Sequence, residues 1–299
     1  MNPSNVSLPT YFKNPTSTTL SSKVAARIDE IYTAEAQSGV LTRGTGHLMK
    51  LADFGGHRVL SIYEREIIQP GTYDRNAIQP LGNPRPVNAK TQTFAITQTA
   101  TLNDKIDVLN ERDTQGILNA QAHIRDEVKH ALIPMYDSHV FSTATNFAAA
   151  NSYVTTVSSG KDVYHDGVVA GKVAFDTRTQ ATVDDACLIA SIDFVGKLRR
   201  SDKFVRDNEV SQVKQVYKGM VGMIDGLEVV QVDPSRFGTT YAAMIIGKRV
   251  LDHIRKIANF RVNNMAEGFF GSLIQYLSYY DTFIARNRGA AIQLIDDNS

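Results

Sequence analysis

The feature that most constrains this chain is a run of prolines between two segments with the composition of β-strands. Residues 59–68 form the first segment, and a Thr-rich alternating segment at 91–101 forms the second. The prolines between them are Pro70, Pro80, Pro84 and Pro86. Because proline is confined to turns and strand edges, the pattern predicts a long projecting hairpin with a stiffened tip. The tip has too few apolar residues to pack alone, so we expect it to lie against another subunit.

The composition is that of a globular protein, and its nearly balanced charge gives no sign of a strongly charged partner. Of the 299 residues, 42% are hydrophobic and 21% are charged, with 32 Lys and Arg residues and 31 Asp and Glu residues. A formal net charge of +1 provides no general attraction to nucleic acid or anionic lipid, so we expect only weak, non-specific contact with DNA. No apolar run approaches the roughly 18 residues of a membrane span, and the N-terminus lacks the blocks of a signal peptide. We therefore expect cytoplasmic synthesis and no membrane partner.

The N-terminal half is predicted to contain an extended arm and two helices. Residues 1–19 hold three prolines among Ser, Thr and Asn and predict the arm, whereas residues 20–39 have the spacing of an amphipathic helix. A second helical pattern opens after the candidate caps Asp113 and Thr114 and extends for about 20 to 30 residues. Pro134 lies inside this pattern and removes a backbone hydrogen bond, which predicts a bend just before it.

The C-terminal half alternates short helices and short strands. The predicted elements are a helix at 166–178, a buried strand at 187–190, a helix capped by Ser191, a hairpin at 220–232 with its turn at Asp225-Gly226, a strand at 241–246 and a terminal hairpin at 279–295. This order lacks a regular alternation of strand and crossover helix, so it favours an α+β fold.

No catalytic signature is complete, so we expect no enzyme activity, no catalytic or cofactor-binding residue and no cofactor. The Gly-Lys pairs lack the following Ser or Thr of a phosphate-binding loop. His123, Glu127 and His130 would share one helix face and are the alternative metal site, but a solvated or inter-subunit face is favoured and no metal is expected. Cys187 is the single cysteine and lies in an apolar strand, which favours structural burial over reactivity.

Several segments, taken in order, resemble the major capsid protein family of tailed bacteriophages. The segments that carry the resemblance are Tyr73-Asp74-Arg75, Leu109 to Thr114, Ile133 to Asp137, Ser191 to Phe194, Ser201 to Phe204, Met223 to Gly226, Val229 to Phe237 and Tyr279 to Asp281. No single segment is diagnostic, and the resemblance rests on their shared order. One departure is Met135, where the family often has an acidic residue after the proline of its long helix.

The resemblance implies an α+β fold of the Hong Kong 97 type with five regions. They are an N-terminal arm with an amphipathic helix (1–52), an extended loop (53–100), a peripheral domain with a long spine helix (101–165), an axial domain (166–267) and returning peripheral strands (268–299). The resemblance also implies a shell of hexamers and pentamers around double-stranded DNA, in a virion capsid whose subunits are made in the host bacterial cytoplasm. The implied partners are copies of the chain and portal, scaffolding and decoration proteins.

Three residues near the turn of the hairpin, Tyr73, Asp74 and Arg75, are predicted to contact a neighbouring subunit. Prolines lower the entropy that a loop loses on docking, Arg can hold a carboxylate bidentately, and Tyr adds rigid apolar area. The alternative for these residues is a solvated loop. For the chain, the alternatives are an encapsulin-like nanocompartment shell and, less favoured, a metal-dependent enzyme that uses the His123, Glu127 and His130 group.

Overall fold

The structure is a computed structural model that describes most of the chain. The described residues are 36–41, 59–65, 71–113, 120–157, 163–200, 205–206, 220–237, 241–264 and 270–297, except 74, 77–78, 80, 82, 85, 184, 249 and 285–287. The predicted arm at 1–19 and most of the predicted helix at 20–39 lie outside these residues. Among the described residues, no helix is long and apolar enough to cross a membrane.

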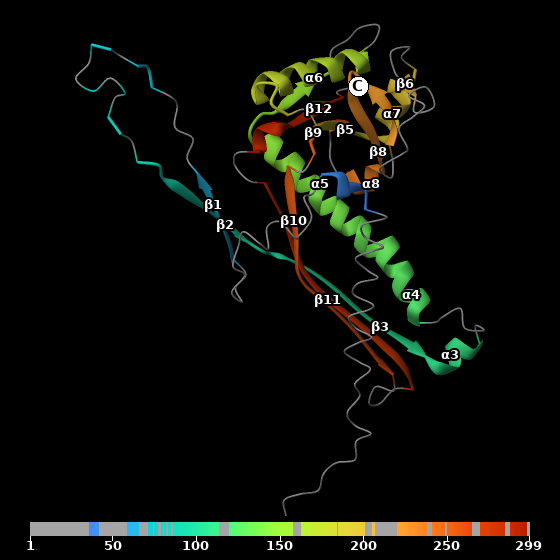
Figure 1. The fold of residues 1–299 in the computed structure, drawn as a ribbon. Coiled ribbons are helices and arrows are strands. Elements are labelled where there is room, and N and C mark those ends of the chain that lie inside the picture. The colour runs from blue at the N-terminus through green and yellow to red at the C-terminus, as the bar shows by residue number, and fades with distance from the viewer. Residues whose placement is uncertain are drawn as a thin grey trace, which may run out of the picture.

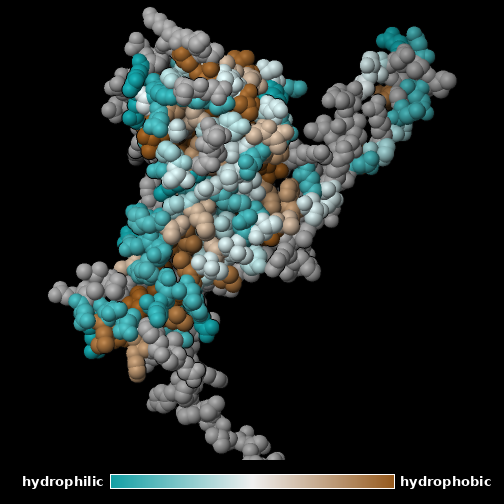
Figure 2. All heavy atoms as spheres, turned by 180° about the vertical axis from the view of Figure 1, so that it is seen from behind, coloured by the Kyte–Doolittle hydropathy of each residue, from teal (hydrophilic) through white to brown (hydrophobic). Residues whose placement is uncertain are grey.

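The predicted hairpin is confirmed and forms a two-stranded sheet of its own. Strand β1 (Val59–Arg65) pairs antiparallel with β2 (Ala89–Ala95) along its full length. The hairpin leaves the body of the molecule and runs away from the other two sheets (Figures 1 and 2). Only Ile96 and Thr97 separate β2 from β3 (Gln98–Asp107), so the root of the hairpin continues directly into the body.

A second sheet consists of three antiparallel strands in the order β10, β11, β3. Strands β10 (Leu251–Asn264) and β11 (Gly271–Ile284) have 14 residues each, and β11 pairs along its other edge with β3. A long helix runs beside this sheet (Figure 1) and contributes Ile133 and Tyr136 to a core that also contains Tyr276. This thin sheet therefore depends on the helix for its buried face.

The long helix contains α4 (Ala120–Glu127), a π turn η3 (Val128–Leu132) and α5 (Ile133–Ala150), which follow one another without a break. At the end of the π turn, the N–H of Ile133 donates to the carbonyl of Val128, five residues earlier. Pro134 lies in the first turn of α5. Proline cannot donate a backbone hydrogen bond and its ring crowds the preceding turn, so the wider π turn accommodates it without ending the helix.

The predicted start of this helix at Asp113 is wrong. Asp113 is the last residue of a separate short helix, α3 (Val108–Asp113), and Thr114 lies outside the described residues. Helix α3 follows β3 directly, and its first turn is capped by Asp107, whose carboxylate accepts a hydrogen bond from the Leu109 N–H at 2.8 Å. Asp107 therefore caps a different helix from the one predicted, and the long helix is described from Ala120 onward.

The third sheet has seven strands in the order β4, β12, β9, β5, β8, β7, β6, and its residues form the largest hydrophobic core. Its strands are β4 (Val154–Thr156), β5 (Ala186–Ser191), β6 (Val205–Arg206), β7 (Met220–Ile224), β8 (Leu227–Val232), β9 (Ala243–Gly247) and β12 (Ile292–Asp296). The other elements around it are the helices α6 (Val163–Thr179), α7 (Ile192–Leu198) and α8 (Pro234–Phe237), with the 3-10 turns η2 (Gln37–Val40) and η4 (Gly289–Ala291). Mixed helices and sheets in this order confirm the α+β class.

Three local predictions in this sheet are confirmed. The apolar run at 187–190 lies inside β5 and is buried. The Ser191 hydroxyl accepts a hydrogen bond from the Phe194 N–H at 3.3 Å and caps α7. Asp225 and Gly226, with φ angles of 48° and 77°, connect β7 to β8. Two successive residues with positive φ give the hairpin turn whose twist matches that of the strands.

The predicted terminal hairpin at 279–295 is wrong, because its two strands belong to different sheets. Strand β11 pairs with β10 and β3, whereas β12 pairs with β9 and β4. Arg178 of α6 holds the start of β12 in place: its guanidinium donates to the Ala290 carbonyl at 2.8 Å and to the Ile292 carbonyl at 2.6 Å. Strand alternation specifies a buried face but not the partner strand, so the sequence favoured the nearer pairing.

Strand pairing also crosses the predicted boundary between the axial domain (166–267) and the returning peripheral strands (268–299). Strand β10 falls in the range 166–267 and pairs with β11, whereas β12 falls in the range 268–299 and pairs into the seven-stranded sheet. The division into five regions stays a prediction.

Replacing the glycine of the β7–β8 turn should weaken the fold. Gly226→Ala should lower the free energy of unfolding by about 1 kcal/mol, because a side chain disfavours the φ of 77°. Gly196 in α7 is the matched control, since nothing lies within 4 Å of a Cβ built there. Gly196→Ala should leave stability unchanged or raise it. Urea unfolding followed by circular dichroism measures both variants, and equal losses would contradict the assignment.

Candidate functional site

The residues predicted to contact a neighbour lie on the projecting hairpin, between β1 and β2. The side chains of Tyr73 and Arg75 are exposed, and Asp74 lies outside the described residues. Two apolar side chains of the same segment are also exposed, Leu81 at 86% and Val87 at 66%. The sequence analysis missed them, although isolated apolar residues among Gly, Asn and Pro were a visible signal. Large apolar side chains gathered on one projection are typical of an interaction surface.

The root of the hairpin is held by a buried carboxylate, that of Asp281 in β11. Its Oδ2 accepts hydrogen bonds from the backbone N–H of Thr97 at 2.9 Å and from the Thr97 hydroxyl at 3.0 Å. Thr97 lies between β2 and β3, where the chain passes from the hairpin into the body. Two bonds from one residue to one charged oxygen fix the backbone at this point.

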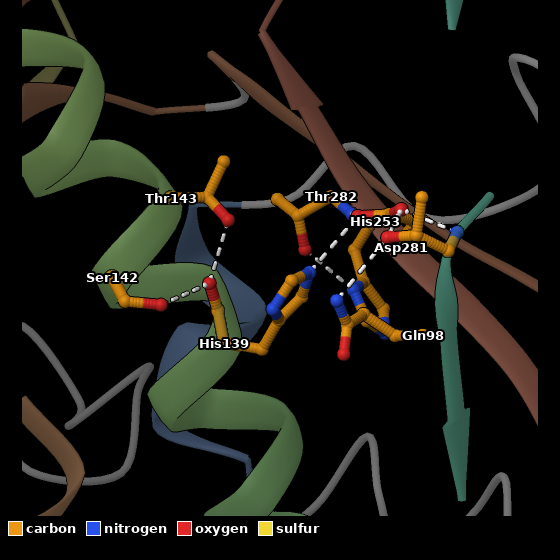
Figure 3. A network of polar contacts seen from close by, with 8 residues as sticks. Gln98, His139, Ser142, Thr143, His253, Asp281 and Thr282 are labelled. Carbon is orange, nitrogen blue, oxygen red and sulfur yellow. Dashed lines mark hydrogen bonds and ion pairs between the residues drawn. The ribbon is translucent and has the colours of Figure 1, made fainter. Parts of the chain in front are cut away.

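The other oxygen of Asp281 connects the root to the long helix (Figure 3). Its Oδ1 lies 3.0 Å from Nε2 of His139 in α5 and accepts the Thr282 N–H at 2.8 Å. Burial alone would raise the pKa of Asp281, but the hydrogen bonds from His139, Thr97 and Thr282 outweigh it and hold the pKa below its ordinary value. The carboxylate is therefore charged at neutral pH, which strengthens each of these bonds.

A second histidine, His253 of β10, completes this network. Its Nδ1 lies 3.0 Å from the Thr282 hydroxyl, and its ring centroid lies 5.9 Å from that of Tyr136 and 6.0 Å from that of Tyr280. Burial, assisted by nearby His139, lowers the pKa of His253 to about 4. The ring is therefore neutral at pH 7, because a charged imidazolium would lose its hydration among these rings.

A second buried carboxylate, that of Asp137 in α5, holds the 3-10 turn η2, at the end of the predicted helix 20–39. Its Oδ1 accepts the Ser38 hydroxyl at 2.6 Å and the Ser38 N–H at 3.2 Å. Its Oδ2 accepts the Gln37 N–H at 3.2 Å and lies 3.3 Å from Nη1 of Arg236. Complete burial raises the pKa of Asp137, and these contacts oppose that rise. Residues 37 and 38 are thus fixed against the same helix turn that holds the hairpin.

Sequence reasoning did not assign roles to these anchoring residues. Asp137 and Asp281 appeared only as ends of segments that resemble the capsid family, and Thr97 and His139 were not singled out. The sequence around a single acidic residue in a helix or strand does not indicate which distant residue will be its hydrogen-bond donor. The contacts from Thr97 to Asp281 and from Ser38 to Asp137 span 184 and 99 residues.

The candidate metal ligands and Cys187 lie on three different elements of the structure, α4, η3 and β5. His123 contacts Asp104 of β3 at 3.2 Å, and His130 lies within the π turn that follows Glu127. Among the described residues there is no group of three or more His, Cys, Asp or Glu side chains arranged to hold a metal ion. Cys187 is fully buried, and burial raises the pKa of its thiol to about 12, so its reactive thiolate does not form near neutral pH.

Solved structures match the chain over most of its length, whereas family models and curated proteins give no match. A structure of Mycobacterium phage Che8 is 12% identical and covers 87% of this chain and 90% of its own, with a TM-score of 0.62. The mature capsid of bacteriophage PhiM1 is 10% identical over 83% and 84%, with a TM-score of 0.59. A virus-like particle from Pyrococcus furiosus is 12% identical over 94% and 99%, with a TM-score of 0.51.

The chain has the Hong Kong 97-type capsid fold. We refer to the three-stranded sheet with its long helix as the peripheral unit, to the seven-stranded sheet with α6, α7 and α8 as the axial unit, and to β1, β2 and the residues between them as the extended loop. In these terms, Asp281 and His139 lie in the peripheral unit and hold the root of the extended loop.

Removing the charge of Asp281 should loosen the root of the extended loop. Asp281→Asn should lower the free energy of unfolding by about 1 to 3 kcal/mol, because buried donors lose a charged acceptor. It should also speed hydrogen exchange at the Thr97 amide. The matched control is Asp104→Asn, which alters a partly exposed Asp–His contact of 3.2 Å, where less than about 1 kcal/mol is expected. Similar losses in both variants would contradict the anchoring role.

Stability should fall in mild acid because of His253. Its pKa is lower in the folded chain, so the unfolded chain binds more protons between about pH 6.5 and pH 4, and stability is lost as the pH falls through that window. The maximum loss is about 3 kcal/mol. His253→Asn removes the titrating ring and should flatten this part of the profile in urea unfolding. If the unfolding free energy of the variant depends on pH between about pH 6.5 and pH 4 as steeply as that of the wild type, the attribution to His253 is contradicted.

Proposed function

We propose that this chain is the major capsid protein of a tailed bacteriophage, and that it assembles into hexamers and pentamers of a closed icosahedral shell around double-stranded DNA. The observation that carries the proposal is the fold, shared with phage structures over more than four fifths of both chains. The phage matches are 9 to 12% identical, so the function is inferred from shape and surface.

The physical character of the chain supports a role in assembly. Its extended loop leaves the body and exposes Tyr73, Leu81 and Val87, and burial of these side chains on a neighbour would stabilise an assembly. The near-neutral charge of the chain suits a container, since a strongly basic lining would hold the genome tightly and resist packaging and ejection.

The proposal includes partners and a location. The main partner is the chain itself, in contacts that include Tyr73, Asp74 and Arg75, and the contact with packaged DNA is weak and non-specific. Portal, scaffolding and decoration proteins are the other proposed partners. The assembled protein is located in the virion capsid, after synthesis in the host bacterial cytoplasm.

An encapsulin-like nanocompartment shell is the second candidate. The observation that favours it is the match to the virus-like particle from Pyrococcus furiosus, which covers more of this chain than the two phage matches described above. The contents of native particles separate the two: a portal and nuclease-protected DNA support the phage capsid, and an enclosed enzyme supports the nanocompartment.

The first experiment is expression of the full chain, followed by size-exclusion chromatography and negative-stain electron microscopy, with and without a scaffolding protein. Closed shells are expected, because the extended loop cannot be stabilised within one chain. A folded monomer at every concentration under both conditions would contradict the proposed function.

Arg75→Ala should impair assembly without unfolding the subunit. If Arg75 pairs with a carboxylate on a neighbour, its truncation should weaken the contact by about 2 to 5 kcal/mol and lower particle yield or thermal stability. Arg199, exposed after α7, is the matched control, and Arg199→Ala should assemble normally. Normal yield and thermal stability of Arg75→Ala shells would reject an energetic role for this side chain.

A further inference from the structure

We propose that the Asp225-Gly226 turn between β7 and β8 is a site of spontaneous covalent modification, in which the backbone rearranges through a cyclic imide to isoaspartate, and that Lys172 of α6 slows this reaction. The reacting groups are the Asp225 side chain and the backbone nitrogen of Gly226, and the other reactant is water. The proposal concerns the folded subunit and does not depend on the proposed shell function.

The reaction begins when the Gly226 nitrogen attacks Cγ of Asp225 in its neutral acid form. A new N–Cγ bond forms, the amide proton and the carboxyl hydroxyl leave together as water, and the cyclic imide closes. Water then opens the imide, and no step changes an oxidation state. Cleavage of the N–Cγ bond restores aspartate. Cleavage of the bond between this nitrogen and the original backbone carbonyl gives isoaspartate, in which the main chain runs through the Asp225 side chain.

The backbone of the turn lies one rotation away from the geometry of ring closure. Asp225 and Gly226 have φ angles of 48° and 77°, which are typical of a type I′ turn with ψ of about 30° at its first central residue. The type II′ turn keeps the positive φ of that residue but has ψ of about −120°. At this ψ, Cβ of Asp225 and the nitrogen of Gly226 lie on the same side of the Cα–C bond, as a small ring requires.

The residue after the aspartate makes this rotation accessible. A type II′ turn needs a negative φ at its second central residue, and glycine adopts either sign of φ. Glycine also has no side chain to shield its nitrogen from the carboxyl group. Both residues are exposed, and the Asp225 side chain is 43% exposed, so water can reach the imide and open it.

Lys172 of α6 restrains both groups that have to move. Its ammonium donates a hydrogen bond to the backbone carbonyl of Asp225, and Nζ lies 3.6 Å from Oδ2 of the same residue. That carbonyl belongs to the peptide that must rotate, and the carboxyl group is the one that is attacked. A hydrogen bond from a charged donor is stronger than one between neutral groups. Lys172 therefore favours the unreactive type I′ turn.

The chain contains a second Asp-Gly sequence in a different setting. Asp166 and Gly167 lie inside helix α6, and Gly167 is buried. A helix holds ψ near about −42° through its backbone hydrogen bonds, so ring closure there requires the helix to open. The same two residue types therefore provide an internal comparison between a turn and a helix.

Peptide mapping of the full chain tests the site. After incubation at neutral pH and physiological temperature, tryptic peptides 219–236 and 162–172 are separated by chromatography and analysed by mass spectrometry. Isoaspartate changes the retention of a peptide without changing its mass, and the imide lowers the mass by one water. The modified fraction at Asp225 should exceed that at Asp166 by at least about tenfold. A sample digested without incubation gives the background.

A variant tests the role of Lys172. Lys172→Met should raise the rate of modification at Asp225 by about two- to fivefold, the value of one exposed charged contact. Lys197→Met is the matched control, because Lys197 of α7 contacts Asp297 at 2.6 Å, and it should leave that rate unchanged. Circular dichroism should show that both variants keep the fold. An unchanged or lower rate in Lys172→Met would reject the restraining role.

Incubation of the same chain in urea shows whether the fold decides the outcome. Without structure, Asp166 and Asp225 should be modified to similar extents. Equal modification of the two sites in the folded chain, or modification of Asp225 in urea alone, would overturn the proposed site. Each of these results is independent of shell formation, which tests the proposed function separately.

Discussion

The arrangement of this molecule depends on one long helix that buries side chains in two separate cores. Ile133 and Tyr136 of α5 lie in the core of the peripheral unit, and Phe141 and Ala144, one to two turns later, lie in the core of the axial unit. A helix is stiff because its backbone hydrogen bonds are internal, so side chains fixed in both cores set how the two sheets lie relative to each other. The two sheets thus act as one body.

Polar contacts at this same part of the helix hold two distant segments, η2 and the root of the extended loop. Asp137 binds residues 37 and 38, and His139, two residues later, binds the Asp281 carboxylate that holds Thr97. A buried carboxylate must keep its hydrogen-bond donors, since losing one leaves a charge without compensation. Such contacts are directional, in contrast to apolar packing, and they fix the positions of residues 37 and 38 and of Thr97 against the helix.

The described part of the chain encloses two of its candidate reactive groups and exposes several large apolar side chains. Cys187 is buried with a raised pKa, and the His139 ring contacts the carboxylate of Asp281. The exposed large apolar side chains include Leu81 and Val87 of the extended loop, and others lie on the helices and on β11. Exposed apolar side chains on a projecting loop are typical of a surface that another molecule covers, and they support the proposed assembly.

The sequence by itself determined the elements whose signals lie within a few residues of one another. The buried strand β5, the Ser191 cap and the Asp225-Gly226 turn each follow from local backbone preferences and short-range hydrogen bonds, and all are confirmed. The hairpin of β1 and β2 was predicted from the prolines between two strand-like segments and is also confirmed, although its paired residues are far apart in the chain. The order of segments along the chain also resembled the capsid fold. These features are predictable because the groups that stabilise them are neighbours in the chain.

Only the tertiary structure decided which distant segments meet. It placed β11 and β12 in different sheets, put Asp113 in the last turn of a separate short helix capped by Asp107, and joined Asp281 to Thr97 across 184 residues. The physical reason is that apolar periodicity states that a face is buried but not what covers it, and a carboxylate carries no local mark of its donor. Those choices depend on packing the whole chain at once.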